Sequence, residues 1–295
     1  EGEDMPIRLC YAGNTFINHT SYQGRLKENT QLGAELIGLD SIEADAEMLA
    51  MVVDGLKQTG LKEFQVNIGH VDFIQSLLET TGFEEDGMDE LRTLITNRNY
   101  FGVDEILDNR NVKGSVKEAF HILPELMGGP EILEQAARLA PNVNARLAIT
   151  RLQQIYKLLK LYHAEDHITF DLSMSGSYGY YSGIIFRAYT YGTGDAVVRG
   201  GRYDHLLEKF GKNTPSIGFA IIVDELMSAL NRQKIHVETS YRNLIVYTQA
   251  TEEWAVSLAM NFRSKGKNIE IIKREPEDDR KKYEDYAVSS GQLPD

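Results

Sequence analysis

Two polar side chains stand on one predicted strand at a spacing that suits ligand binding. Gln31 and Glu35 lie four residues apart in the stretch QLGAELIG. Successive side chains of a strand point to opposite faces, so this even spacing puts both on the same face. A carboxylate and an amide on a sheet face, joined by tyrosine hydroxyls, can hold a small polar cation or a zwitterion.

A second polar group follows a pair of glycines in the stretch GGRYDHLLEKFG. Gly200 and Gly201 run directly into Arg202 and Tyr203, after a stretch that is typical of two short strands. Adjacent glycines at the end of a strand indicate a bulge or a close approach of the backbone to a neighbouring group. The sequence therefore predicts that something lies against the backbone at this point.

The tyrosine pair Tyr180 and Tyr181 opens the strand-rich stretch just upstream and completes the candidate site. A structural interpretation stands beside the functional one. In it Glu35 forms a salt bridge with Arg202, and the tyrosines are half-buried core residues. The pattern alone favours this structural interpretation and leaves ligand binding as a hypothesis.

The sequence lacks the motifs of several reaction classes. Its seven histidines are scattered, and no Cys/His pair has the spacing of metal ligands, so we expect no metal site. Neither the phosphate-binding G-x-x-x-x-G-K-[ST] loop nor the G-x-S-x-G elbow of hydrolases occurs. We therefore expect no bound cofactor.

Charge and hydropathy bear on partners and location. The formal net charge is -13, and no dense block of Lys and Arg occurs, so nucleic-acid binding is not favoured. No run of eighteen apolar residues occurs, and no leader opens the chain, which predicts a soluble cytoplasmic protein with no membrane contact. The single cysteine, Cys10, lies in IRLCYAG, and we expect it to be an inert thiol in a buried strand.

The elements that must position the candidate site alternate between strand and helix in residues 1–82. Strand patterns at IRLCYAG and QLGAELIG are followed by a helix that begins at an Asp40 N-cap, with Glu43 three residues on, and ends at Gly60. Its apolar stripe consists of Ile42, Ala46, Leu49, Val53 and Leu56. A further strand, EFQVNIG, and a second helix complete this part.

The remaining chain changes texture twice. Residues 83–163 carry helical periodicity almost throughout, and strand patterns return in residues 164–238. This order predicts an α+β domain made of residues 1–82 and 164–238, with an antiparallel sheet flanked by helices and a helical insertion at 83–163. Residues 239–295 alternate strand, helix, strand and helix, which predicts a small C-terminal α/β unit.

Three stretches in order resemble the histidyl-tRNA synthetases, over roughly residues 6 to 235. They are YAGNTFINHTSYQGRLKENTQLGAELIG, YYSGIIFRAY followed by GGRYDHLL, and TPSIGFAIIVDEL. In what it lacks, the chain is more similar to the synthetase paralogues that serve as regulatory subunits of ATP phosphoribosyltransferase. The resemblance implies a class II aminoacyl-tRNA synthetase-like fold. It also places motif 1 of that fold outside this chain, and it makes the C-terminal unit similar to the start of an anticodon-binding domain.

Three positions at which synthetases carry arginine are changed here. They are Ile17, Gly176 and Glu225. In the synthetases these cations stabilise the negative charge that develops on phosphate during adenylation, and the loss of one such group typically costs about 3 kcal/mol. The resemblance therefore implies no catalytic residues and a protein that is not itself an enzyme.

The amino-acid pocket of the synthetases is retained in part. The resemblance implies that Gln31 faces the α-amino group of histidine and that Glu35 and Tyr181 face its imidazole. The other implied pocket residues are Tyr180, Gly200, Gly201, Arg202, Tyr203 and Gly218. In this family the regulatory subunit pairs with a short-form catalytic subunit and confers feedback inhibition by histidine.

Oligomeric state and two alternatives complete the sequence-based hypotheses. A homodimer within a hetero-oligomer is expected, built through the strand-rich lobe, with the strand IRLCYAG and the apolar stripe of the first helix in or near the core of that lobe. One alternative is a histidyl-tRNA synthetase, an ATP-dependent ligase, with divergent motifs. The other is a synthetase-like binding module with a different partner or ligand.

Overall fold

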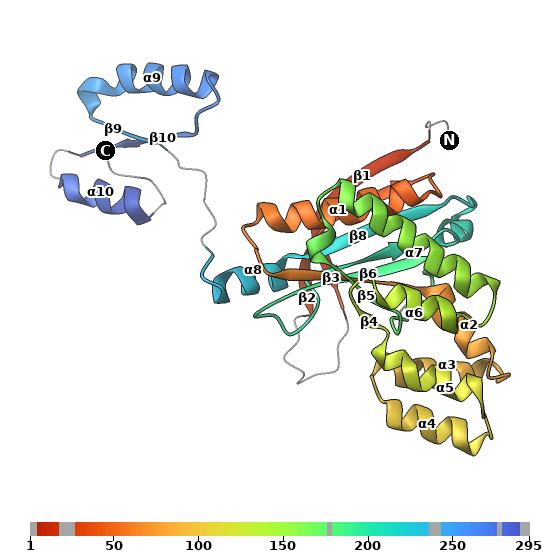
Figure 1. Ribbon diagram of the computed structural model, residues 1–295. Helices are drawn as coiled ribbons and strands as arrows, with labels where there is room; N and C mark the ends of the chain where they lie inside the picture. Colours follow the sequence, from red (N-terminus) through yellow and green to blue (C-terminus); the bar gives the residue numbers. More distant parts are fainter. Residues whose placement is uncertain (1–4, 18–26, 176–178, 236–242, 276–278, 290–295) are drawn as a thin grey trace. The chain divides into compact units, whose positions relative to one another are not determined.

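The computed structural model describes residues 5–17, 27–175, 179–235, 243–275 and 279–289. The chain forms two compact units, residues 1–235 and 236–295, both drawn in Figure 1. The boundary expected at residue 238 therefore falls close to the boundary between these units.

A single sheet of eight described strands forms the centre of the first unit. In sheet order the strands are β1 (Ile7–Phe16), β2 (Glu28–Ile37), β8 (Ser216–Ile222), β7 (Val198–Arg202), β6 (Ile184–Thr190), β3 (Phe64–His70), β5 (Ile168–Asp171) and β4 (Met127–Gly128). Neighbouring strands are antiparallel except β3 and β5, which are parallel. The prediction of an α+β fold is confirmed, and the expected antiparallel sheet contains this one parallel pair among the described strands.

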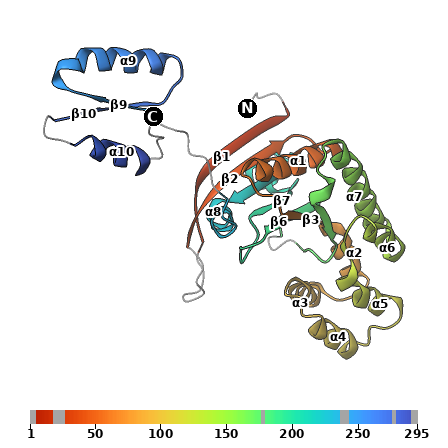
Figure 2. The ribbon, with the colours of Figure 1, turned by 60° about the vertical axis from the view of Figure 1, so that its left-hand side comes forward.

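Helix α1 (Ile42–Gln58) covers one face of this sheet beside α7 (Val143–Leu161), as Figures 1 and 2 show. The predicted cap at Asp40 is wrong, because Ser41 accepts the hydrogen bond from the backbone N–H of Ala44 at 3.2 Å. Asp40 instead accepts from Arg151 on α7 at 3.0 Å. The apolar stripe of α1 packs into the hydrophobic core of its own unit, as expected, and the homodimer stays a prediction.

The helical stretch between residues 83 and 163 belongs to the same compact unit as the sheet. Its helices are α3 (Glu85–Thr96), α4 (Tyr100–Asn109), α5 (Ser115–Ile122), α6 (Ile132–Leu139) and α7. Its strand β4 pairs with β5, and α7 packs against α1 and against α2 (Val71–Glu79). One hydrophobic core runs through the sheet and these helices, so residues 83–163 do not form a separate core of their own. That they are an insertion into the sheet domain stays a prediction.

The second unit has the strand, helix, strand and helix order that the sequence predicts. Its elements are β9 (Asn243–Tyr247), α9 (Glu252–Ser264), β10 (Ile269–Lys273) and α10 (Arg280–Ser289). Strands β9 and β10 are parallel neighbours. A parallel pair needs a crossover connection, and α9 supplies it.

Strand β1 lies at the edge of the sheet, next to β2 alone among the described strands. Most of its side chains are exposed, and Leu9 keeps 53% of its surface accessible. Cys10 is exposed as well, so the prediction of a buried thiol is wrong. The sequence identified the strand correctly, but it does not show that the strand lies at the edge of the sheet.

Candidate functional site

A cavity of about 700 Å³ lies over strands β2, β8 and β7. Gln31, Glu35 and Tyr203 line it, as do Tyr180 and Tyr181. Strand pairing explains the convergence, because Glu35 is opposite Gly218 on β8, and Gly218 is opposite Gly201 on β7. The structure thus brings together polar groups from segments about 150 residues or more apart, and Gln31 and Glu35 share one face as the sequence predicts.

Glu35 is the central polar group of this cavity. Its carboxylate accepts a hydrogen bond from the Tyr203 hydroxyl. Burial raises the pKa of Glu35, and the bond from Tyr203 offsets part of that effect. The pKa of Tyr203 is raised strongly, first by burial and then by its bond to Glu35, so this phenol stays a donor. The pair presents a partly desolvated carboxylate to a ligand that can donate hydrogen bonds.

Glycines provide the space for these side chains. A Cβ atom at Gly218 would collide with the Glu35 carboxylate, and one at Gly201 would collide with the ring of Tyr181. Gly200 lines the cavity with its backbone, but its missing side chain makes room for Phe186 on the other face. The glycine pair is therefore required by close approach of neighbouring side chains on both faces, and it lies within the paired part of β7.

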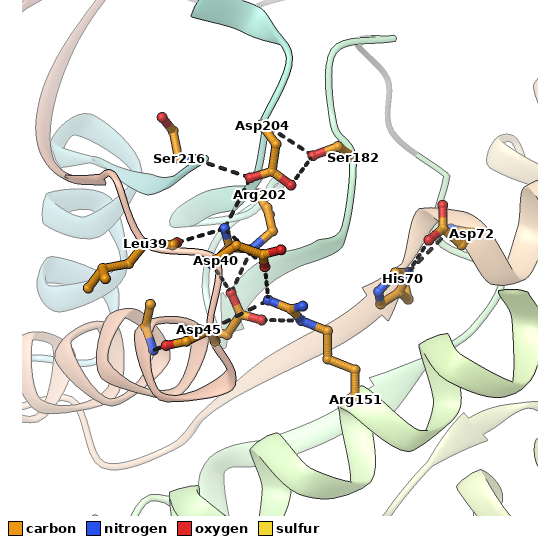
Figure 3. A network of polar contacts seen from close by, with 12 residues as sticks. Leu39, Asp40, Asp45, His70, Asp72, Arg151, Ser182, Arg202, Asp204 and Ser216 are labelled. Atoms are coloured by element: carbon orange, nitrogen blue, oxygen red, sulfur yellow. Dashed lines mark hydrogen bonds and ion pairs between the residues drawn. The ribbon is translucent and has the colours of Figure 1, made fainter. Parts of the chain in front are cut away.

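Arg202 does not line the cavity, although the sequence placed it with the other site residues. It is 1% exposed and donates to Asp45 on α1 through Nε at 2.9 Å and Nη2 at 2.6 Å. Nη1 donates at 3.0 Å to the Leu39 carbonyl and to Asp204. Figure 3 shows this network, in which Asp45 also accepts from Arg151 at 2.6 Å.

The proposed structural salt bridge between Glu35 and Arg202 is therefore wrong. The two residues belong to different polar clusters, because consecutive side chains of a strand alternate between its faces. Arg202 points to the helix-covered face, whereas Tyr203 reaches Glu35 in the cavity. The long sequence separation of Arg202 and Asp45 hides this partnership from any local pattern.

Several cavity residues escaped the sequence analysis. Tyr11 of β1 is one, and its ring occupies the space above Gly33. Burial, together with the charge of Glu35, raises the pKa of the Tyr11 hydroxyl. The other missed side chains are Asn29, Asp195, Arg199, Phe219, Ala220 and Ile222. Arg199 offered a usable signal, because it lies two residues before Gly201 and so on the same face of β7.

Two of the three positions at which the resemblance implies a replaced arginine lie in this cavity. Ile17 and Glu225 both line it. Glu225 is placed there by the start of α8 (Val223–Arg232), which is fixed to β2 by the bond from the Thr30 backbone N–H to Asp224 at 2.7 Å. The third changed position, Gly176, lies outside the described residues.

Two absences hold for the described part of the chain. There, no group of three or more His, Cys, Asp or Glu side chains is placed to hold a metal ion. Nor does any described helix combine the length and apolarity that a membrane crossing requires.

Comparison with known proteins gives the class first. Residues 2–226 match the family model of histidyl-tRNA synthetase. A solved histidyl-tRNA synthetase from Nostoc sp. PCC 7120 has a TM-score of 0.79 over 98% of this chain and 69% of that one, at 17% identity, so it speaks for the fold alone. The predicted class II synthetase-like fold is confirmed.

More similar relatives narrow the class. The ATP phosphoribosyltransferase regulatory subunit of Acetivibrio thermocellus is 36% identical over 90% of this chain and 64% of its own length. That of Thermoanaerobacter pseudethanolicus is 35% identical over 92% of this chain and 72% of its own. The chain belongs to the histidyl-tRNA synthetase-like family and, within it, to the ATP phosphoribosyltransferase regulatory subunits.

A solved structure from Bacillus halodurans supports this assignment. It is described as an ATP phosphoribosyltransferase regulatory subunit/histidyl-tRNA synthetase. Its TM-score is 0.81 at 30% identity, over 96% of this chain and 72% of that one. The chain thus spans roughly two thirds to three quarters of these relatives, and slightly less than two thirds of the Acetivibrio protein.

Proposed function

We propose that this chain is the non-catalytic regulatory subunit of ATP phosphoribosyltransferase and makes the first step of histidine biosynthesis sensitive to histidine. The cavity over β2, β8 and β7 binds the amino acid. Its occupancy shifts the assembly toward an inhibited state, because a ligand moves such an equilibrium by its difference in affinity for the two states.

The observation that carries this proposal is the contrast inside the cavity. Glu35, Tyr203 and Gln31 present hydrogen-bonding groups that suit a small zwitterion. At two positions where synthetases hold phosphate with arginine, the cavity has Ile17 and Glu225. A carboxylate at the second position repels phosphate, so the site favours the amino acid over the reaction of that amino acid with ATP.

The name regulatory subunit, carried by the relatives, implies a catalytic subunit of ATP phosphoribosyltransferase as partner. In this proposal that partner is the short-form catalytic subunit. We also propose self-association into a homodimer within that hetero-oligomer. The edge strand β1 supports self-association, because Leu9 and Tyr11 are exposed on a ten-residue strand with an unpaired edge in the described structure. Sedimentation that shows a stable monomer at micromolar concentration would contradict the homodimer.

A histidyl-tRNA synthetase is the second candidate, because the family model and the description of the Bacillus halodurans structure both carry that name. Histidine-dependent ATP–pyrophosphate exchange separates the two. The regulatory subunit gives background exchange, and it makes the activity of an added short-form catalytic subunit responsive to histidine. Exchange above background, with no effect on the catalytic subunit, would establish the synthetase instead.

A further inference from the structure

Arg199 is the one basic side chain among the described residues that line the cavity. It shares the cavity with the acids Glu35, Asp195 and Glu225. Asp195 forms an ion pair with its Nη2, and 40% of the Arg199 side chain remains exposed. Its Nε is buried and has no hydrogen-bond partner in the described structure. The guanidinium has five N–H donors, so most of its capacity is not accounted for by Asp195.

The register of the sheet fixes where this cation stands. Arg199 is opposite Ala220 on β8, and Ala220 is opposite Gly33 on β2. Gly33 lies midway between Gln31 and Glu35, so Arg199 faces that strand at the midpoint of the two polar groups. The Arg199 backbone is about 10 Å from β2, two strand spacings away. Ala220, with its small side chain, is the residue between them.

We propose that Arg199 binds the carboxylate of the amino acid held in this cavity. The inference rests on the proposed function. Glu35, Gln31 and Arg199 form the corners of a triangle on one sheet face, and the three polar groups of histidine match those corners in chemistry. Imidazole N–H and ammonium groups donate to the carboxylate and the amide. The planar guanidinium holds a carboxylate with paired hydrogen bonds.

The experiment compares histidine with histamine, which has the same ring and amine but no carboxylate. Calorimetric titration of the wild type, with the short-form catalytic subunit present, is expected to show histidine binding roughly ten- to hundredfold more tightly than histamine. Arg199→Gln removes the charge and is expected to bind the two compounds with similar affinity, at the histamine level. Arg199→Lys keeps the positive charge but lacks the paired N–H groups of the guanidinium. Its preference for histidine over histamine should lie between those of the wild type and Arg199→Gln.

Two matched controls isolate the contact. Asp195→Asn removes the ion-pair partner but leaves the cation, and it should bind histidine at least as tightly as the wild type. Arg187 is opposite Arg199 on β6 and lines a separate cavity of about 480 Å³. Arg187→Gln should therefore keep the full preference for histidine over histamine. Melting temperatures show which variants fold, and the lysine variant decides the question if the glutamine variant does not.

The outcomes separate this inference from the function beneath it. If the wild type binds histidine and Arg199→Gln keeps the full preference for histidine over histamine, the role of Arg199 is overturned. The proposed function stays intact in that case. If Arg199→Gln does not fold, an undiminished preference in Arg199→Lys would overturn that role in the same way. A wild type that binds neither compound would overturn both. An equal loss of both compounds in a folded Arg199→Gln protein would assign Arg199 to the shape of the cavity, which also contradicts the inference.

Discussion

Arg202 and Tyr203 are consecutive residues that belong to two polar clusters of different character. Arg202 lies in a closed cluster with Asp45 and Arg151, where buried charges contact one another under helices α1 and α7. Tyr203 belongs to the open cluster around Glu35, on the wall of a cavity. The first has its charges matched within the chain, whereas the second lines a cavity, which the proposed function assigns to a ligand.

The difference teaches how one short motif serves two purposes. The buried arginine fixes the end of β7 to the first turn of α1. The next residue is thereby held in position to donate to Glu35. The motif therefore contains a structural half and, under the proposed function, a binding half. Substitutions in the two halves should fail in different ways.

The largest expected effect is in the closed cluster. Asp45→Ala leaves a buried Arg202 without its main partner, and such losses destabilise a protein by about 3–5 kcal/mol. Urea unfolding of wild type and variant measures the change. The control is Asp40→Ala, since Asp40 pairs with Arg151 but its side chain is 56% exposed, and it should cost no more than about 1 kcal/mol. Equal effects of the two variants would contradict the closed cluster.

The next effect is in the open cluster and concerns ligand rather than folding. Glu35→Gln keeps the volume and an acceptor for Tyr203 but removes the charge. Histidine should bind roughly ten- to hundredfold more weakly, as expected for a charged hydrogen bond. The melting temperature without histidine should not fall, because a carboxylate with a raised pKa is not stabilised by burial. Loss of stability with unchanged binding would reverse the assignment of Glu35.

A smaller effect, dependent on pH, is expected at His70. This buried residue caps α2 by accepting from the Asp72 backbone N–H at 3.3 Å. Burial, and then the charges of Arg151 and Arg202, lower its pKa to about 3, although the Asp72 carboxylate lies 3.8 Å away. Between pH 6.5 and about 3 the unfolded chain binds a proton that the folded chain does not, so stability falls as pH falls through that range.

The test is the slope of unfolding free energy against pH. His70 contributes at most about 1.4 kcal/mol per pH unit, the value for one proton. His70→Asn keeps an acceptor at the cap and removes this dependence, so its slope between pH 6 and pH 4.5 should be shallower than that of the wild type. Identical slopes would show that His70 takes up its proton in the folded protein. Substitution of the exposed His205 is the matched control and should leave the slope near wild type.

Local pattern predicted the elements and much of the cavity, because strand alternation is a property of neighbours in sequence. It placed Gln31 and Glu35 on one face correctly. It misplaced Arg202, since the partner of Arg202 is Asp45, which lies 157 residues away in sequence. It missed Tyr11, since nothing in β1 marks which of its side chains overhangs Gly33. Only the register of neighbouring strands, which depends on the whole fold, brings Arg199 beside Ala220.

The smallest expected effect is none at all. Ile17 lines the cavity. The resemblance to the synthetases implies an arginine at this position, so Ile17→Arg would supply one such cation. The variant should still give background histidine-dependent ATP–pyrophosphate exchange, because Glu225 keeps its negative charge in the same cavity. One phosphate-binding group is worth about 3 kcal/mol, and the absence of further such groups leaves the barrier high. The double variant, Ile17→Arg with Glu225→Arg, is the more sensitive test. Any ATP–pyrophosphate exchange should appear in it before it appears in the single variant. Clear exchange in the single variant would mean that the open cluster is a synthetase site lacking one residue, and the regulatory assignment would have to be abandoned.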